Sequence, residues 1–222
     1  MIKTLAALNW GLGLEILKTL DIIKAVRICG VITQHDEKSD DKWLNAVYDF
    51  SIRRGLRVMD QRTMDFADMK RFINEQDIDI MITHSYMRKM PSEIFTAPRY
   101  GSINIHPSLL PKYRGSSPTH WVLKNREKKT GLTVHFISEG IDEGDIINQA
   151  EVSVEETDTI DTIIEKQKRT IAPLLNEAFA LITDTNFKPR PQLHETASYA
   201  PKPINRKADV RDIGTSQTRW QN

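Results

Sequence analysis

Short apolar runs alternate with longer amphipathic segments along most of this chain. The β-type runs predict strands at residues 2–8, 26–33, 56–59, 78–83, 100–105, 131–138 and 146–154. Apolar residues near helical spacing predict a helix to about residue 21 after a turn at 9–13, and further helices at 42–54, 65–75 and 159–183. The run at 78–83 is nearly continuous, which is typical of a central parallel strand. This alternation predicts a Rossmann-like, mostly parallel twisted sheet with helices on both faces.

The composition changes near residue 186. Charges become frequent, and four prolines interrupt any regular pattern: Pro189, Pro191, Pro201 and Pro203. We therefore expect one folded domain at 1–185 and a short, partly irregular C-terminal extension at 186–222. Tyr199 and Trp220 are the residues of this extension best suited to dock onto the domain or a ligand, although simple packing or disorder is the favoured alternative.

The composition of these 222 residues, 39% hydrophobic and 27% charged, is that of an ordinary globular protein. The net charge of +1 provides no basic surface of the kind that general nucleic-acid binding needs. No apolar run is long enough to span a bilayer and the first residues lack a signal-peptide layout, so the cytoplasm is the expected compartment. The single Cys29 excludes an internal disulfide and is expected to be a buried strand residue.

A polar pair lies near the end of the predicted strand at 100–105. Side chains two residues apart in a strand share a face, so Asn104 and His106 point the same way while Ile105 packs into the opposite layer. Pro107 ends the strand because proline cannot donate to a ladder. The pair therefore lies at the carboxyl end of a strand, where open α/β sheets bind their ligands.

A carboxylate follows the next predicted strand. Asp142 lies in the loop E-G-I-D-E-G-D between Gly140 and Gly144, and we expect these glycines to permit positive φ and close approach to a ligand. An amide, an imidazole and a carboxylate can divide the work of acyl transfer. Asn104 would donate to an oxyanion, His106 would polarise the same oxygen or move a proton, and Asp142 would set the charge of the imidazole or collect a proton. Each residue alone more often has a structural role; their joint occurrence favours a site.

Other motifs are weaker. Gly11 and Gly13 match only two positions of the dinucleotide-binding pattern G-x-G-x-x-G, since Ile16 occupies the third. The helix that begins here can still attract a phosphate with its amino terminus, and Trp10 can stack on a ring, although burial beside the sheet is the favoured alternative. The histidines show no metal-ligand spacing, and no G-x-S-x-G motif indicates a serine hydrolase.

The string N-I-H-P-S-L-L-P-K-Y-R-G at 104–115, with Asp142 downstream, resembles the folate-dependent formyltransferase family. That family includes glycinamide ribonucleotide formyltransferases, methionyl-tRNA formyltransferases and nucleotide-sugar N-formyltransferases. Strong similarity covers roughly 80–154, and pattern-level similarity covers most of the remainder. The resemblance implies the formyltransferase fold, a catalytic domain at 1–185, 10-formyltetrahydrofolate as the formyl donor and no metal. It also implies three catalytic residues: Asn104, His106 and Asp142.

The resemblance further assigns binding positions. The loop after the central strand and the loop before the carboxylate would hold the pterin ring of the folate, largely through backbone groups. The matching positions here are Met87, Arg88, Lys89, Met90, Glu139, Gly140 and Ile141. The acceptor substrate is expected to contact Asn9, Trp10, Gly11, Pro107 and Ser108. The expected partners are small molecules, with no nucleic acid and no membrane, and a homodimer is left open.

Three features of the sequence narrow the choice of acceptor substrate. Tyr-Arg-Gly at 113–115, with Pro118 and Trp121, resembles the methionyl-tRNA and sugar enzymes more than the glycinamide ribonucleotide enzymes. The tRNA enzymes carry a basic C-terminal β-barrel, which we do not expect here because the chain ends about eighty residues after Asp142. The segment Q-H-D-E-K-S-D-D at 34–41 is acidic and poorly suited to tRNA phosphates. A nucleotide-linked amino sugar is therefore the leading acceptor; glycinamide ribonucleotide, methionyl-tRNA, and water in a formyltetrahydrofolate hydrolase stay open, as does a non-catalytic folate-binding protein.

Overall fold

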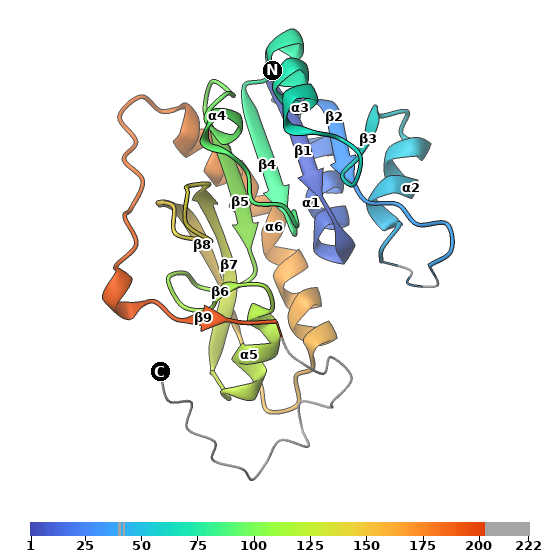
Figure 1. Cartoon of the computed structure of the whole chain (residues 1–222). Helices are drawn as coiled ribbons and strands as arrows, with labels where there is room; N and C mark the ends of the chain where they lie inside the picture. Colours follow the sequence, from blue (N-terminus) through green and yellow to red (C-terminus); the bar gives the residue numbers. More distant parts are fainter. Residues whose placement is uncertain (40, 42, 203–222) are drawn as a thin grey trace.

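A seven-stranded sheet forms the centre of the computed structural model, which describes residues 1–39, 41 and 43–202 (Figure 1). The strand order is β3-β2-β1-β4-β5-β7-β8. Five strands pair in parallel: β1 (Ile2–Leu8), β2 (Val26–Thr33), β3 (Val58–Asp60), β4 (Ile80–His84) and β5 (Ser102–His106). At one edge β7 (Lys129–Phe136) and β8 (Ile146–Ser153) join antiparallel. The predicted mostly parallel sheet is confirmed.

Helices cover both faces of the sheet because its strands are apolar on both sides. Ala6 and Leu8 belong to one core together with α1 (Trp10–Ile22), α2 (Ala46–Arg53) and α6 (Ile160–Thr183). Leu5 and Ala7 alternate with them and pack on the opposite side, against α3 (Phe66–Gln76) and α4 (Ser92–Phe95). The carboxyl ends of the parallel strands share one edge, which is left for a site.

Two of the predicted helices begin where their capping residues lie. The side chain of Asp65 accepts from the backbone N–H of Asp68, and α3 begins at the next residue, Phe66. Thr159 and Thr162 form a reciprocal capping box at the start of α6.

The structure differs from the prediction in several places. The helix predicted at 42–54 begins only at Ala46, because the side chain of Asn45 bonds the backbone N–H and carbonyl of Asp36 and holds a turn there. Two short helices, α4 and α5 (Pro118–Lys124), were not predicted; four and seven residues are too short to show a helical period. Cys29 is half-buried, so its predicted burial is wrong.

Residues 184–202, which we call the C-terminal strap, pass along the side of the sheet that β8 forms and then reach β6 (Arg114–Gly115) (Figure 1). Arg190 exchanges two backbone hydrogen bonds of 2.8 Å with Ile146. Further along, β9 (Tyr199–Ala200) pairs in parallel with β6. The Tyr199 hydroxyl donates to Glu143 at 2.7 Å, so this aromatic residue docks on the domain, whereas Trp220 lies outside the described residues.

Asn9 ties together the carboxyl ends of the central strands. Its side chain is fully buried, and its Oδ1 accepts from the Thr33 hydroxyl at 3.1 Å and the Gln34 backbone N–H at 3.0 Å. Its Nδ2 donates to Gln61 Oε1 at 2.7 Å and to the Ser85 carbonyl at 3.0 Å. Residues from four loops at the site edge thereby share one amide.

Replacement of Asn9 by alanine should lower the free energy of unfolding by about 3 kcal/mol, because it leaves several buried donors and acceptors without partners. Chemical denaturation measures this loss. Asn176→Ala is the matched control: Asn176 is exposed and its amide bonds only the Ala172 carbonyl, so the change should stay within about 0.5 kcal/mol. Equal effects of the two substitutions would contradict the role given to Asn9.

The side chain of His84, the last residue of β4, links this strand to β5. The ring is 3% exposed, and its Nδ1 lies 2.8 Å from the Ile105 carbonyl, to which it donates. Burial lowers the pKa of His84 from 6.5 to about 4. The folded protein therefore holds this ring neutral at pH values where the unfolded chain already protonates it.

This difference predicts an acid-sensitive fold. Because the folded pKa of His84 is depressed, its contribution to the free energy of unfolding is complete above pH 6.5 and is lost as the pH falls to about 4, by about 3 kcal/mol. His84→Asn keeps an N–H near the Nδ1 position and cannot titrate. Denaturation at a series of pH values should show a smaller loss in the variant, while the comparison at pH 8 isolates any packing effect. Parallel curves for the two proteins would refute this account.

Candidate active site

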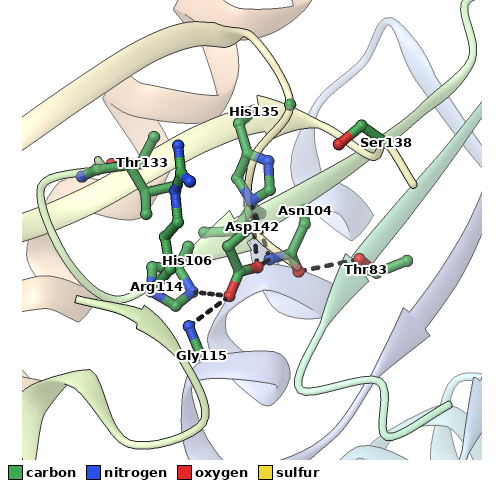
Figure 2. A network of polar contacts seen from close by, with 12 residues as sticks. Thr83, Asn104, His106, Arg114, Gly115, Thr133, His135, Ser138 and Asp142 are labelled. Carbon is green, nitrogen blue, oxygen red and sulfur yellow. Dashed lines mark hydrogen bonds and ion pairs between the residues drawn. The ribbon is translucent and has the colours of Figure 1, made fainter. Parts of the chain in front are cut away.

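Three polar side chains form a row across neighbouring strands at the site edge (Figure 2). The strand register places Thr83 of β4 beside Asn104 of β5, and Asn104 beside His135 of β7. The Thr83 hydroxyl donates to Asn104 Oδ1 at 2.9 Å, and Asn104 Nδ2 lies 3.2 Å from His135 Nε2. Thr83 therefore fixes the amide of Asn104 with its NH₂ group directed at the opposite end of the row.

His135 is itself oriented by its surroundings. Its Nδ1 lies 2.8 Å from the Phe136 carbonyl and donates to it, which leaves Nε2 to accept from Asn104 in the neutral ring. The pairing of β7 with β8 shifts register between Val134 and His135. Such bulges re-aim a side chain, and here the shift accompanies the residue that closes the polar row.

Asp142 receives its partners from three separate segments (Figure 2). The Gly115 backbone N–H donates to Oδ2 at 2.8 Å, and His106 Nδ1 lies 3.4 Å from the same oxygen. On the other side, Asn104 Nδ2 donates to Oδ1 at 3.2 Å and His135 Nε2 lies 3.6 Å away. The side chain is only 14% exposed, so the Gly115 N–H and the Asn104 amide donate to a carboxylate that little water reaches.

The backbone of this loop differs from the expectation in one respect. Asp142 itself adopts the left-handed conformation, with φ of 55°, whereas neither Gly140 nor Gly144 has positive φ, so the positive φ expected of the glycines is wrong. Gly144 is needed for a different reason: a Cβ there would lie 1.8 Å from the Phe136 carbonyl oxygen. The close approach is to the protein's own strand, and the strained residue carries the carboxylate.

His106 lies between two hydrogen-bond acceptors. Its Nε2 is 2.8 Å from the Tyr113 carbonyl and its Nδ1 faces Asp142. Tyr113 has φ of 62°, a left-handed conformation that turns this carbonyl onto the ring. The short contact assigns the proton of the neutral ring to Nε2, and Nδ1 is then the nitrogen that can accept a proton beside the carboxylate.

The surroundings lower the pKa values of both His106 and Asp142. Burial lowers the pKa of His106, and the neighbouring Asp142 carboxylate and the Tyr113 carbonyl offset only part of that effect. Burial acts to raise the pKa of Asp142, but His106, His135 and the Gly115 N–H outweigh it and hold that pKa below its usual range. Near pH 7 the site therefore contains an ionised carboxylate beside a neutral imidazole, a pair able to take up a proton.

The structure brings together the three residues predicted as catalytic. Three contributors were not predicted: Thr83, Gly115 and His135. The alternation of the strand at 131–138 places His135 on one face, but its position beside Asn104 depends on an antiparallel register that one sequence does not reveal.

Some of the residues predicted to bind the acceptor already use their polar side chains in hydrogen bonds within the protein. The Asn9 amide is committed to the strand ends, and Ser108 is fully buried with its hydroxyl donating to the Lys112 carbonyl at 2.7 Å. Pro107 is half-buried beside it. Trp10 and Gly11 open α1, and Trp10 has φ of 64°.

The residues predicted to bind the folate lie in two loops that follow strands of the polar row. Met87 and Ile141 expose 66% and 63% of their surface, which fits contact with an apolar ring. Lys89 and Glu139 are also exposed, and Gly140 is half-buried. The other two side chains have structural contacts: Met90 is 6% exposed in the core, and Arg88 donates to the Gln61 and Met64 carbonyls.

The described residues contain neither a metal-binding cluster nor a membrane-spanning helix. No group of three or more His, Cys, Asp or Glu side chains in this part of the chain is placed to hold a metal ion. Within the same residues, no helix combines the length and apolarity needed to cross a membrane.

The sequence is similar to known proteins. The family model described as formyl transferase matches residues 14–178. The methionyl-tRNA formyltransferase of Bacillus subtilis is 33% identical over 203 residues, which cover 90% of this chain and 63% of that protein. The same enzyme of Geobacillus thermodenitrificans is 41% identical over 123 residues, 55% of this chain and 39% of that protein. The chain thus spans less than two thirds of the length of these relatives.

Solved structures share the fold. Glycinamide ribonucleotide transformylase 1 of Symbiobacterium toebii has a TM-score of 0.70 at 25% identity, covering 87% of this chain and 95% of that one. WlaRD, a sugar 3N-formyl transferase solved with dTDP and 5-N-formyl-THF, has a TM-score of 0.68 at 20% identity, covering 91% and 70%. Because the family model covers most of the sequence, this chain belongs to the formyl transferase family.

Proposed function

We propose that this chain transfers a formyl group from 10-formyltetrahydrofolate to a primary amine. The arrangement around Asp142 carries the proposal: an ionised carboxylate, a neutral imidazole and an oriented amide converge at one sheet edge. Acyl transfer to an amine needs such a proton acceptor next to a hydrogen-bond donor for the carbonyl oxygen. The exposed apolar side chains of Met87 and Ile141 support a site for the folate ring beside them.

Each residue then has a defined task. The amine nitrogen bonds to the formyl carbon, and Asp142 takes the proton that the nitrogen loses, with His106 Nδ1 as its neighbour for onward transfer. Asn104 donates to the oxygen that becomes negative. Its present contacts of 3.2 Å are at the long end for hydrogen bonds, so a substrate oxygen can compete for them. The bond to the folate nitrogen breaks, and that nitrogen receives a proton.

A phosphate-bearing acceptor fits the start of α1. Asn9 uses its amide elsewhere and makes no capping bond, and the first turn of the helix contains no acidic residue. Free N–H groups and the helix dipole favour a phosphate there. The acidic segment at 34–41 begins in the sequence directly after β2, which ends at the same edge, and its charge disfavours a large polyanion. A nucleotide-linked amino sugar is therefore the acceptor that we propose.

Methionyl-tRNA is the second candidate. It is favoured by the relatives that are 30% or more identical over most of this chain, which are methionyl-tRNA formyltransferases. The sugar enzymes share 20–23% identity with this chain, and that similarity shows the fold alone.

Tetrahydrofolate release from 10-formyltetrahydrofolate by the purified protein distinguishes these acceptors. The panel comprises nucleotide-linked amino sugars, glycinamide ribonucleotide and methionyl-tRNA, with formylated product identified by mass spectrometry. We expect release that depends on an amino sugar. Release that depends only on methionyl-tRNA would replace our acceptor, release without any amine would indicate a hydrolase, and no release would reject the proposed reaction.

Substitution of Asn104 by alanine or of Asp142 by asparagine should lower turnover by about 10²–10³-fold, because one removes the oxyanion donor and the other the proton acceptor. Steady-state kinetics on the acceptor identified above measure the loss. Circular dichroism checks that both variants fold.

Asn176→Ala and Asp49→Asn are the matched controls, since both residues are exposed on helices away from the polar row. They should retain wild-type turnover. Near-wild-type turnover in the Asn104 or Asp142 variant would remove that residue from the mechanism.

A further inference from the structure

The turn that carries Asp142 is held from outside the region that the family model matches. Gln192 of the C-terminal strap donates from Nε2 to two backbone carbonyls of this turn, Asp142 at 2.9 Å and Gly144 at 2.7 Å. The Gln192 side chain is 6% exposed. A buried donor thereby bonds the carbonyl of the left-handed Asp142 and that of the residue two positions further along the turn.

Gln192 is in turn held by Arg114. The guanidinium of Arg114 donates to Gln192 Oε1 from Nε at 3.1 Å and from Nη2 at 2.9 Å. Arg114 is 1% exposed, and its Nη1 pairs with Glu143 at 3.2 Å (Figure 2 shows it beside the site). The amide of Gln192 therefore cannot flip without losing hydrogen bonds at both ends.

The same strap also supports the segment that faces Asp142 and His106. The backbone N–H of Tyr113 donates to the Ser198 hydroxyl at 2.9 Å, and that of Arg114 donates to the Ser198 carbonyl at 2.8 Å. These residues precede Gly115, whose N–H holds the Asp142 carboxylate, and Tyr113 supplies the carbonyl that fixes the His106 ring. Strap contacts thus lie behind both sides of the carboxylate–imidazole pair.

We propose that Gln192, held by Arg114, is a positioning residue that keeps the Asp142 carboxylate in place beside Asn104 and His106. The C-terminal strap is then part of the catalytic unit. This inference rests on the proposed function for its kinetic consequence. Among the described residues, the hydrogen bonds of the Gln192 side chain go to the backbone of the turn and to the Arg114 side chain, so its effect on the reaction passes through Asp142.

Two substitutions separate positioning from mere anchoring. Gln192→Ala removes both ends of the bridge. Gln192→Glu keeps an acceptor for Arg114, and so keeps the strap attached, but presents an oxygen to the Asp142 and Gly144 carbonyls in place of the donor. Arg190→Ala is the matched control, because Arg190 belongs to the same strap and its side chain bonds Gln149 of β8, at 2.6 Å.

We expect both Gln192 variants to lower kcat by about 10- to 100-fold, since a displacement of about 1 Å in a catalytic group costs rates of this order. KM for the formyl donor should change less than about threefold, and Arg190→Ala should keep wild-type kcat. Gln192→Glu should also retain a melting temperature near that of the wild type. Wild-type kcat in Gln192→Glu would overturn the proposal.

A second readout needs no turnover. The ring resonances of His106, followed by NMR over a pH series, respond to the Asp142 carboxylate beside the ring. They should change in both Gln192 variants and stay unchanged in Arg190→Ala. If the wild-type protein transfers no formyl group, the proposed function fails, yet this measurement still decides the positioning role. Identical His106 titrations in the wild type and Gln192→Glu would reject it.

Discussion

The site depends on keeping a carboxylate charged where little water reaches it. Asp142 is mostly buried, and a carboxylate in such a position is stable only when other groups replace its lost hydration. The Gly115 backbone N–H and the Asn104 amide donate to the carboxylate, and the His106 and His135 rings lie beside its two oxygens. This arrangement comes at a cost to the local backbone, because Asp142 and Tyr113 both adopt the left-handed conformation that places the carboxylate and the Tyr113 carbonyl in the site.

Strand register is the means by which the fold assembles these groups. Thr83, Asn104 and His135 come from three strands. They form one hydrogen-bonded row because the pairing of β4 with β5 sets Thr83 beside Asn104, and that of β5 with β7 sets Asn104 beside His135. A slip of one residue would turn each side chain to the opposite face. Behind this row, His84 and Asn9 connect strand ends through buried side-chain hydrogen bonds, so the edge that carries the chemistry is also one of the most firmly bonded parts of the sheet.

The features that the sequence predicted correctly are those with a local signature. Apolar runs located the strands, and the two-residue spacing of Asn104 and His106 placed them on one face. The loop after the next predicted strand offered Asp142 as the carboxylate, and the resemblance to formyltransferases grouped it with them. Contributors that depend on long-range geometry were missed: His135 through an antiparallel register, and Gln192 through a strap 50 residues beyond Asp142 along the chain. The composition of residues 186–222 correctly predicted irregular backbone for the strap. Composition could not show how many hydrogen bonds the strap makes to the domain.

Titration of the carboxylate and imidazole in the intact protein tests this account most directly. NMR of protein labelled with ¹³C at aspartate and ¹⁵N at histidine can follow Asp142 and His106 across the pH range in which the protein stays folded. Asp142 should remain ionised below the ordinary aspartate pKa of 3.8, and His106 should take up a proton only below pH 6.5. An Asp142 that titrates at or above its ordinary value, or a His106 that is protonated above 6.5, would contradict the arrangement from which the proposed chemistry follows.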